Sequence, residues 1–409
     1  MSKSNEDRIR ECLASNQVFI FGTGNFGNLV LHGLLVKGVH VQGFIDLNPN
    51  NVGSVISGIP VIDTLSIPEG SHVVLASNRN NIPFLKKTLD KSKASSFDNC
   101  DFLFDDFDYV GIDTDWSIEM CKEEIDLFMF SIHNQYNDID QDPGGKADNL
   151  RIKSLDVVLT EKCNLKCVDC SNLMQYYKEP KNTEHLVLLE SINTFMRHVD
   201  YVHELRIIGG EPFVYRDIDK VMELLLGYDN FGKIVIYTNG TVVPRENVLA
   251  LSVDSRVSFL ISDYGAALSN RSKQLASVLE ERKVKYIRER IISWHDCAAI
   301  DKKNRSSDET YEVFSNCCAK DTLSLLHGKV YGCPFSAHAD NLGAIPKFED
   351  DVVDLQAADS KSISNKLKLM VSGTQYFGAC LFCNGRDYTV STVPAAVQTK
   401  TTLDYEKIQ

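Results

Sequence analysis

Three cysteines in the middle of the chain have a spacing that suits one metal centre. Cys163, Cys167 and Cys170 fall within eight residues, in the pattern C-x-x-x-C-x-x-C. A loop can turn three such thiolates toward one centre, and no histidine or further cysteine follows within ten residues. A structural zinc site needs a fourth protein ligand. Three cysteines instead suit an iron–sulfur cluster with one open iron, where a small molecule can bind.

A second group of cysteines occurs near the C-terminal end of the sequence. The neighbours Cys317 and Cys318 precede Cys333, and a C-x-x-C pair, Cys380 and Cys383, follows. Four of these thiolates would fill either a structural zinc site or a second iron–sulfur cluster. The spacing leaves both metals open, and it does not separate Cys317 from Cys318. The remaining cysteines are scattered, which is typical of small buried apolar side chains.

A glycine-rich turn near the start of the sequence could bind a phosphate. Gly22, Gly24 and Gly27 form a G-x-G-x-x-G directly after the apolar run 18–21, and a second apolar run ends in Asp46. The glycines permit a tight turn, and the helix that follows offers unpaired N–H groups to an anion. The pattern predicts a nucleotide or dinucleotide site, with a vestigial site or a docking module as the alternative.

The elements that must position these residues alternate between strand and helix. Apolar runs at 18–21, 41–45, 60–62 and 72–76 predict a first parallel sheet. Later runs predict strands at 155–159, 205–208, 234–240 and 257–264, separated by helical segments such as 187–199 and 218–226. This alternation is typical of α/β folds, in which the chemistry lies at the carboxyl ends of the parallel strands. Residues 101–150 are predicted to form a connector.

Composition narrows the partners that this chain can have. Its 409 residues predict two to three domains, and 43 basic against 56 acidic residues leave a net charge of −13. That balance disfavours nucleic acid and anionic membrane as partners. No apolar run approaches the length of a membrane span, and the charged first residues lack the apolar core of a secretory signal. We therefore expect a cytoplasmic protein.

The run CNLKCVDC resembles the cluster loop of the radical S-adenosylmethionine (SAM) enzymes. The later G-G-E-P and T-N-G segments agree with that family in order and spacing, whereas Asp169 departs from the aromatic residue usual before the third cysteine. The resemblance implies a partial (β/α)6 barrel over residues 151–300, a [4Fe–4S] cluster on Cys163, Cys167 and Cys170, and a flavodoxin- or ferredoxin-like reductant. It also implies contacts between SAM and residues at three strand ends, with Glu211 near the methionyl ammonium: Gly209, Gly210, Glu211, Pro212, Thr238, Asn239, Ser262 and Asp263.

Residues 301–409 resemble the shortened auxiliary-cluster extension, called twitch, of the larger SPASM group. A glycine, Gly328, lies five residues before Cys333, and a distant C-x-x-C follows. The resemblance implies a second [4Fe–4S] cluster held by Cys333, Cys380, Cys383 and one of the pair Cys317 and Cys318. Such a cluster has no open iron, so its implied role is electron transfer.

Residues 1–100 resemble the small Rossmann domains of bacterial sugar acetyltransferases and sugar methyltransferases. That resemblance implies a nucleotide-sugar, or alternatively NAD, held by Gly22, Gly24, Gly27 and Asp46. Together with a likeness to twitch-type enzymes of sugars and aminocyclitols, it predicts a sugar or nucleotide-sugar substrate. The reaction would be a dehydrogenation, a dehydration or an epimerisation.

Epimerisation would need a hydrogen donor on the far side of the substrate, and Cys297 is a candidate. The first alternative is a radical SAM enzyme or maturase that modifies peptides. The second is a noncatalytic sensor that carries a redox cluster. The expected fold class is α/β: a Rossmann-like parallel sheet, then the partial barrel, then a small cysteine-rich domain.

Overall fold

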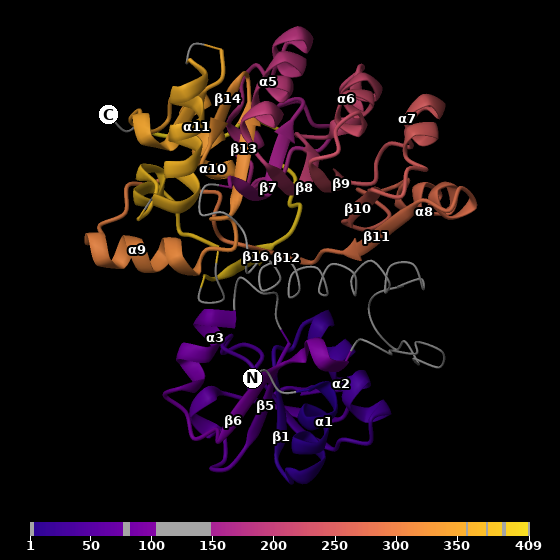
Figure 1. The fold of residues 1–409 in the computed structure, drawn as a ribbon, viewed down its shortest axis with the longest axis vertical. Coiled ribbons are helices and arrows are strands. Elements are labelled where there is room, and N and C mark those ends of the chain that lie inside the picture. The colour runs from indigo at the N-terminus through magenta and orange to yellow at the C-terminus, as the bar shows by residue number, and fades with distance from the viewer. Residues whose placement is uncertain are drawn as a thin grey trace. The chain divides into compact units, whose positions relative to one another are not determined.

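The computed structural model describes residues 4–76, 82–103, 149–356, 359–373, 375–386 and 390–407. They divide into two compact units, one within residues 4–103 and one within residues 149–407 (Figure 1). Most of the predicted connector, residues 104–148, lies outside the described residues. No helix in the described parts of the chain has the length and apolar character needed to cross a membrane.

The first unit is built on a six-stranded sheet with the order β3-β4-β2-β1-β5-β6. Its neighbouring strands are parallel except for the antiparallel pair β3 and β4. The predicted runs are confirmed as strands to within a residue. The strands are β1 (Val18–Phe21), β2 (Val41–Ile45), β3 (Val55–Ile56), β4 (Ile59–Ile62), β5 (His72–Leu75) and β6 (Ser96–Asn99).

Helices cover both faces of this first sheet. One apolar cluster joins the sheet to α1 and α2, and another joins its opposite face to α3. Fully apolar strands such as β1 are expected when a parallel sheet is buried on both sides. The helices are α1 (Asn5–Ala14), α2 (Asn25–Val36) and α3 (Ile82–Leu89), with short 3-10 turns η1 (Thr64–Ser66) and η3 (Cys100–Leu103).

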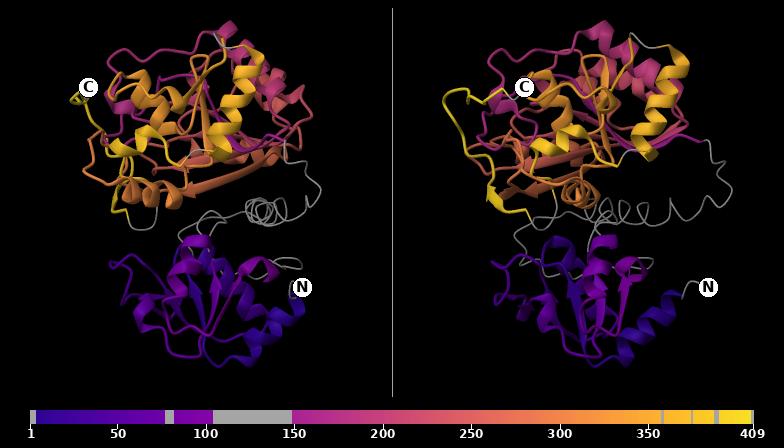
Figure 2. Two further views of the ribbon diagram at one scale, coloured as in Figure 1. Left: turned by 60° about the vertical axis from the view of Figure 1, so that its left-hand side comes forward. Right: turned by 90° about the vertical axis from the view of Figure 1, so that its left-hand side faces the viewer.

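The second unit contains an eight-stranded sheet with the order β11-β10-β9-β8-β7-β13-β14-β15. Strands β7 to β11 are parallel and follow one another in chain order, as the alternating pattern predicts. These strands are β7 (Arg151–Val158), β8 (Tyr201–Ile208), β9 (Phe231–Thr238), β10 (Val257–Asp263) and β11 (Lys285–Arg290). Figure 2 shows the same sheet from two further sides.

The sixth parallel strand of this sheet comes from beyond the boundary predicted at residue 300. Strand β13 (Thr322–Leu326) pairs with β7, and the antiparallel strands β14 (Lys329–Tyr331) and β15 (Val352–Asp354) extend the sheet. Meanwhile β12 (Ser293–His295) leaves the sheet and pairs with β16 (Thr392–Pro394). The cysteine-rich region therefore shares one sheet with strands β7 to β11 rather than forming a separate layer.

Helices α5 to α8 line one face of the second sheet (Figure 1). Their apolar sides form one large core with alternate strand residues such as Leu155, Leu205 and Ile234. The other face of the sheet carries the residues between these, many of them polar. The helices are α5 (His185–His198), α6 (Ile218–Leu226), α7 (Glu246–Leu251) and α8 (Ser272–Glu281).

The remaining elements surround the second group of cysteines. The helices are α9 (Ser307–Asn316), α10 (Pro334–Asn341) and α11 (Ser360–Lys368), the last continuing into a π-helical turn η7 (Leu369–Gly373). The 3-10 turns of this unit are η4 (Met174–Tyr176), η5 (Pro212–Val214), η6 (Glu349–Asp351) and η8 (Gly378–Phe382). A further apolar cluster packs α10 against η8 and the segment around Leu173.

Candidate active site

The loop after β7 carries the first three cysteines. It begins at Leu159, and Thr160 anchors it by donating a hydrogen bond to Asn182 Oδ1 (2.8 Å). Burial raises the pKa of the Cys163 thiol to about 12 and that of Cys167 to about 11. The free protein therefore holds both as thiols, and a metal would bind by displacing their protons.

The G-G-E-P segment after β8 packs directly against this loop. The amide of Gly210 donates to Thr160 O (2.8 Å), and the amide of Glu211 donates to Lys162 O (2.9 Å). A Cβ on Gly210 would lie 2.4 Å from Lys162 O, and one on Gly209 would lie 2.6 Å from Thr160 O. Only glycine fits at either position, because a side chain would collide with loop backbone.

The carboxylate of Glu211 is fully buried and binds the end of the next strand. It accepts hydrogen bonds from Thr238 Oγ1 (2.9 Å), from the Asn239 amide (2.9 Å) and from the Phe213 amide (3.3 Å). Burial raises the pKa of this carboxyl to about 7, although those hydrogen bonds oppose the shift. Both carboxylate oxygens are thus used within the protein, joining the ends of β8 and β9.

Asn239 connects the end of β9 to the cysteine loop. Its side-chain amide donates to Asn164 Oδ1 (3.0 Å) and lies 3.6 Å from Cys163 Sγ. Gly240, which follows, has φ +69°, a left-handed conformation that favours glycine. The turn therefore brings a side-chain donor to the first cysteine.

The end of β10 lies one strand further along the sheet and carries Ser262 and Asp263. Asp263 accepts from the Gly265 amide (2.7 Å) and from Ser272 Oγ (3.1 Å), and it pairs with Arg290 (3.4 Å). The eight residues predicted to contact SAM thus lie at or just after the carboxyl ends of three adjacent parallel strands, at the same edge of the sheet. The structure brings the strand ends together, while Glu211 and Asp263 direct their carboxylates to protein partners.

Four of the second group of cysteines line one small cavity. Cys317 ends α9, Cys333 begins α10, and Cys380 and Cys383 belong to η8 or follow it. The cavity has a volume of about 30 Å³ and is otherwise walled mainly by apolar side chains. Cys318 is not part of its wall, so the structure favours Cys317 of the adjacent pair.

The spread of the cysteine sulfurs bears on the choice of metal. A zinc ion at about 2.3 Å from four tetrahedral sulfurs would hold them roughly 3.8 Å apart. Among the described residues, no three cysteine sulfurs lie within 4.8 Å of one another. A preformed tetrahedral zinc site of cysteines is therefore not present among the described residues.

A match to a family model covers the first cysteine loop and the G-G-E-P and T-N-G segments. Residues 157–260 match the model of the radical SAM superfamily. This part of the chain is a radical SAM domain. A domain of this family binds a [4Fe–4S] cluster and SAM.

Curated relatives match less than half of the chain. The chain is similar to GTP 3',8-cyclase of Campylobacter jejuni, with 22% identity over 158 residues, which is 37% of this chain and 43% of that protein. It is also similar to molybdenum cofactor biosynthesis protein 1 of Drosophila melanogaster, with 36% identity over 95 residues, 22% of this chain and 16% of that protein. The match thus spans less than half the length of either relative.

Solved structures resemble the chain more loosely. BtrN in complex with AdoMet and 2-DOIA aligns with 18% identity and a TM-score of 0.35, over 63% of this chain and 99% of BtrN. Native anSMEcpe with bound AdoMet aligns with 12% identity and a TM-score of 0.40, over 63% of this chain and 93% of that protein. TM-scores below 0.5 carry no argument about the details of this site.

Two residues beside the radical SAM domain contribute to the site without any signal in the sequence. Gln398 donates from Nε2 to Cys167 Sγ (3.1 Å), and Arg386 donates from Nη2 to Ser171 O (3.1 Å). Each contact joins residues more than 200 positions apart, and neither residue belongs to a motif. Only the folded path of the chain brings them to the cysteine loop.

Cys297 is buried and interacts electrostatically with cysteines of both groups. It is 2% exposed. Burial raises the pKa values of Cys170 and Cys383, and the electrostatic effect of Cys297 raises both further. The positive charge of Arg386 opposes the shift at Cys170 and Cys383. The thiol predicted as a hydrogen donor therefore neighbours one cysteine of each group.

The sheet face opposite helices α5 to α8 carries a buried carboxylate, Asp156, on which the charges of Arg206 and Arg386 act. Asp156 in β7 is 3% exposed, and the Ser324 hydroxyl and Arg206 both act on its carboxylate. Arg206 Nη1 lies 3.9 Å from it. Burial raises the pKa of Asp156 to about 6, although the charges of Arg206 and Arg386 oppose the shift. An ionised carboxylate has about four lone-pair sites, so this buried group can still accept a hydrogen bond from a ligand donor.

The glycine turn of the first unit has a structural reason for two of its glycines. Gly22 has φ +121°, and a Cβ on Gly27 would lie 2.0 Å from Gly22 O. Gly24, by contrast, caps α2, and a Cβ added there would have nothing within 4 Å. Asp46 accepts from Thr23, from the Asn48 amide (2.8 Å) and from Asn51 Nδ2 (2.8 Å). Its carboxylate is therefore engaged by its own loop and by Thr23 of the glycine turn.

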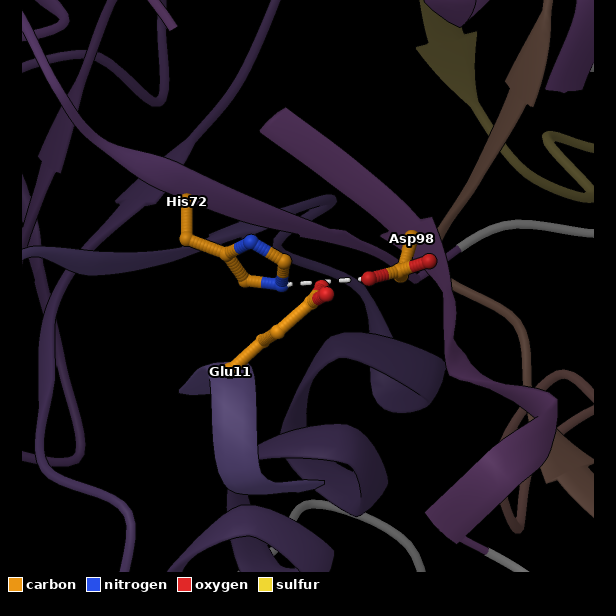
Figure 3. A group of neighbouring side chains, drawn as sticks. All are labelled: Glu11, His72 and Asp98. Atoms are coloured by element: carbon orange, nitrogen blue, oxygen red, sulfur yellow. Dashed lines mark ion pairs between the residues drawn. The ribbon is translucent and has the colours of Figure 1, made fainter. Parts of the chain in front are cut away.

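Three side chains of the first unit form a separate group that could ligate an ion (Figure 3). Glu11 comes from α1, His72 from β5 and Asp98 from β6, and their ligand atoms lie within 4.8 Å of one another. His72 Nε2 lies 3.5 Å from Asp98 Oδ2. His72 is the first residue of β5, whereas the glycine turn follows the last residue of the parallel β1. The group therefore lies at the other end of the sheet, where it ties α1 to two strands.

Proposed function

We propose that this chain is a radical SAM enzyme with two [4Fe–4S] clusters that removes a hydrogen atom from a sugar or nucleotide-sugar. The first cluster would be held by Cys163, Cys167 and Cys170. When SAM is bound, the cluster supplies the electron that splits SAM into methionine and a hydrogen-abstracting radical. The observation that carries the proposal is the meeting of the cysteine loop with G-G-E-P and T-N-G at one sheet edge.

The donors present fit that cofactor. Three soft sulfur ligands leave one iron free, and the loop is fixed by backbone hydrogen bonds to Gly210 and Glu211. Since the Glu211 carboxylate is used by Thr238 and Asn239, the SAM ammonium would be bound by backbone carbonyls of the G-G-E-P segment. Glu211 then acts as a positioning residue.

The second cluster would be held by Cys317, Cys333, Cys380 and Cys383. With four cysteine ligands it has no free iron, so we assign it electron transfer to or from the substrate. Cys297 lies near a cysteine of each group, which supports its role as hydrogen donor if the reaction is an epimerisation.

Asp156 supports a hydroxyl-bearing substrate. Its buried carboxylate, which interacts with Ser324 and Arg206, keeps lone pairs that can accept a hydrogen bond from a hydroxyl, and Arg206 and Arg386 supply positive charge. A buried acceptor and two guanidinium groups suit a polar ligand better than an apolar side chain of a peptide. The reaction class, whether dehydrogenation, dehydration or epimerisation, follows from which hydrogen is removed.

We propose that the first unit is a Rossmann-like domain that binds the nucleotide part of the substrate, with NAD as the alternative. The amino end of α2 is open at Gly24 and suits a phosphate. The order of its strands reverses beside β1, where ligands of open α/β sheets bind. Thermal shift with UDP-sugars and with NAD would separate the two ligands, and Gly24→Ala should weaken the one that binds.

The proposal is tested on anaerobically reconstituted protein. We expect about eight irons per chain and dithionite-dependent formation of 5′-deoxyadenosine, both lost in part or whole on cysteine substitution. The triple change of Cys163, Cys167 and Cys170 to Ala should abolish SAM cleavage, and Cys317→Ala should halve the iron while Cys318→Ala should not. About four irons together with zinc would overturn the second cluster, and persistent cleavage in the triple variant would overturn the first.

The substrate is tested by the increase in SAM cleavage that it causes. A panel of nucleotide-sugars, sugars and peptides is compared, with Asp156→Asn as the variant. We expect stimulation by a member of the sugar class, lost in Asp156→Asn while basal cleavage stays. Stimulation by peptides alone would instead establish the peptide-modifying alternative.

A further inference from the structure

The segment after β16 runs back across the first cysteine loop. Its backbone pairs with the loop in antiparallel fashion, with a bridge between Cys167 and Gln398. The amide of Val168 donates to Val397 O (2.8 Å), and the amide of Thr399 donates to Lys166 O (2.8 Å). Figure 2 shows this yellow C-terminal segment along the outside of the second unit. Residues 395–403 are called the tail strand below.

The tail strand continues to hold the unit beyond the loop. Lys166 Nζ donates to Thr402 Oγ1 (2.7 Å), and the Leu403 amide donates to Gln175 O (2.9 Å). Further on, the Tyr405 hydroxyl donates to Leu342 O (2.7 Å), and its ring meets Tyr176 edge-on at 5.5 Å. The strand is therefore anchored on both sides of the cysteine loop.

The Gln398 side chain has its orientation set by three hydrogen bonds. Nε2 donates to Cys167 Sγ (3.1 Å) and to Ala396 O (2.8 Å), while Oε1 accepts from the Lys166 amide (2.8 Å). A flipped amide would place its NH₂ against the Lys166 N–H and its oxygen against the sulfur. The donor therefore faces the sulfur because the alternative loses all three bonds.

The turn that aims Gln398 is itself strained. Ala396 has φ +56°, a left-handed conformation that costs a non-glycine residue about 1 to 2 kcal/mol. It is only 2% exposed, and its carbonyl accepts one of the Gln398 bonds. Strain of this kind persists where surrounding contacts hold the backbone in place. The tail strand is thus built to a defined geometry at the sulfur.

We propose that the tail strand is part of the cluster site and that Gln398 tunes and protects the cluster through Cys167. The inference rests on the proposed function, because it needs a cluster on that thiolate. A donor to a cluster sulfur stabilises the additional negative charge of the reduced form, so it raises the reduction potential. The strand also leaves Cys167 only 8% exposed and stands between its sulfur and the solvent.

Substitutions at Gln398 separate this role from simple anchoring. The backbone pairing with residues 166–168 needs no particular side chain, so it remains in every variant. Gln398→Glu keeps the shape but replaces the donor by a carboxylate beside the thiolate. Gln398→Leu removes both polar atoms. Lys400→Ala, two residues on and exposed, is the matched control.

The first measurement follows the potential of the cluster whose EPR signal changes when SAM is added. We expect Gln398→Glu to shift its midpoint potential to a more negative value, Gln398→Leu to shift it less, and Lys400→Ala to leave it in place. In air, the iron of the same cluster should be lost several-fold faster in both Gln398 variants. Wild-type potentials and wild-type iron loss in both variants would overturn the proposal.

A second measurement needs no cluster. In the metal-free protein, alkylation of Cys167 by iodoacetamide is followed by mass spectrometry, with Cys163 as the internal reference. We expect several-fold faster alkylation of Cys167 in Gln398→Leu and in a chain ending at Pro394. Equal rates in all proteins would contradict the tail contact. A reconstituted protein without a SAM-responsive signal would instead contradict the proposed function, whatever the alkylation rates.

Discussion

Gly210→Ala is the substitution that most directly tests how the cysteine loop is held. The added Cβ would lie 2.4 Å from Lys162 O, 2.6 Å from its carbonyl carbon and 2.8 Å from Cys163 Cβ. Two of these are backbone atoms, so the clash cannot be relieved by turning a side chain. Loop and strand end must separate by about 1 Å to reach the ordinary contact of 3.4 Å.

The expected cost adds two effects. Overpacking of a tight contact costs about 1 to 3 kcal/mol. The hydrogen bonds from Gly210 to Thr160 and from Glu211 to Lys162 weaken as well, at about 0.5 to 1.5 kcal/mol each. We therefore expect the free energy of unfolding of the second unit to fall by about 2 to 6 kcal/mol, and Cys163 to lose its place in the metal site.

The assay compares Gly210→Ala with Gly227→Ala. Gly227 ends α6 with φ −73°, and the nearest atom to an added Cβ lies at 3.2 Å. A glycine to alanine change in such a conformation alters stability by less than about 1 kcal/mol. Urea unfolding of the metal-free proteins gives the free energies, and iron per chain after reconstitution gives the effect on the site. Equal stability and equal iron in the two variants would refute the reasoning.

Three further substitutions test other parts of the structure. Burial lowers the pKa of His338 to about 4, so the folded state should lose up to about 3 kcal/mol of stability as pH falls from 6.5 to 4. His338→Gln should flatten that part of a curve of stability against pH, and an unchanged slope would contradict this. Burial alone would raise the pKa of Glu204, but Arg206 and Lys233 lower it to about 2. Glu204→Gln should therefore destabilise the second unit by about 3 kcal/mol, measured by urea unfolding at pH 7. Unchanged stability would show that the ion pairs of Glu204 with Arg206 and Lys233 are dispensable. Gly27→Ala would place a Cβ 2.0 Å from backbone and should increase hydrogen exchange across residues 18–45 while residues 151–290 stay protected; protection in both units would contradict the tight turn.

Local patterns predicted the elements and the first cysteine loop well. The helix at 218–226 is found with those bounds, and the strand predicted at 257–264 ends one residue earlier. Both depend on side-chain periodicity within a short window, which sequence records directly. The loop with Cys163, Cys167 and Cys170 was equally accessible, because three ligands within eight residues need no knowledge of distant chain.

Contacts between distant segments were beyond such reasoning. The pairing of β13 with β7 moves a strand from the cysteine-rich region into the barrel sheet, and no periodicity names a strand's partner. Cys317 lines the cavity of the second group and Cys318 does not. This difference depends on the backbone direction at the end of α9, which the sequence does not reveal. The engaged carboxylate of Glu211 was missed for a related reason, because its partners lie on the next strand.

The place of β13 in the sheet has a consequence for the order in which the protein can assemble. Strands β7 to β11 pair with one another soon after each is made. The second neighbour of β7, strand β13, comes some 168 residues later, where Ser154 meets Thr322. Closing so long a loop slows folding far more than it weakens the fold. Until then β7 is an exposed edge, prone to pair with other chains. The tail strand follows β13 in the chain, so Cys167 also remains uncovered until late in assembly.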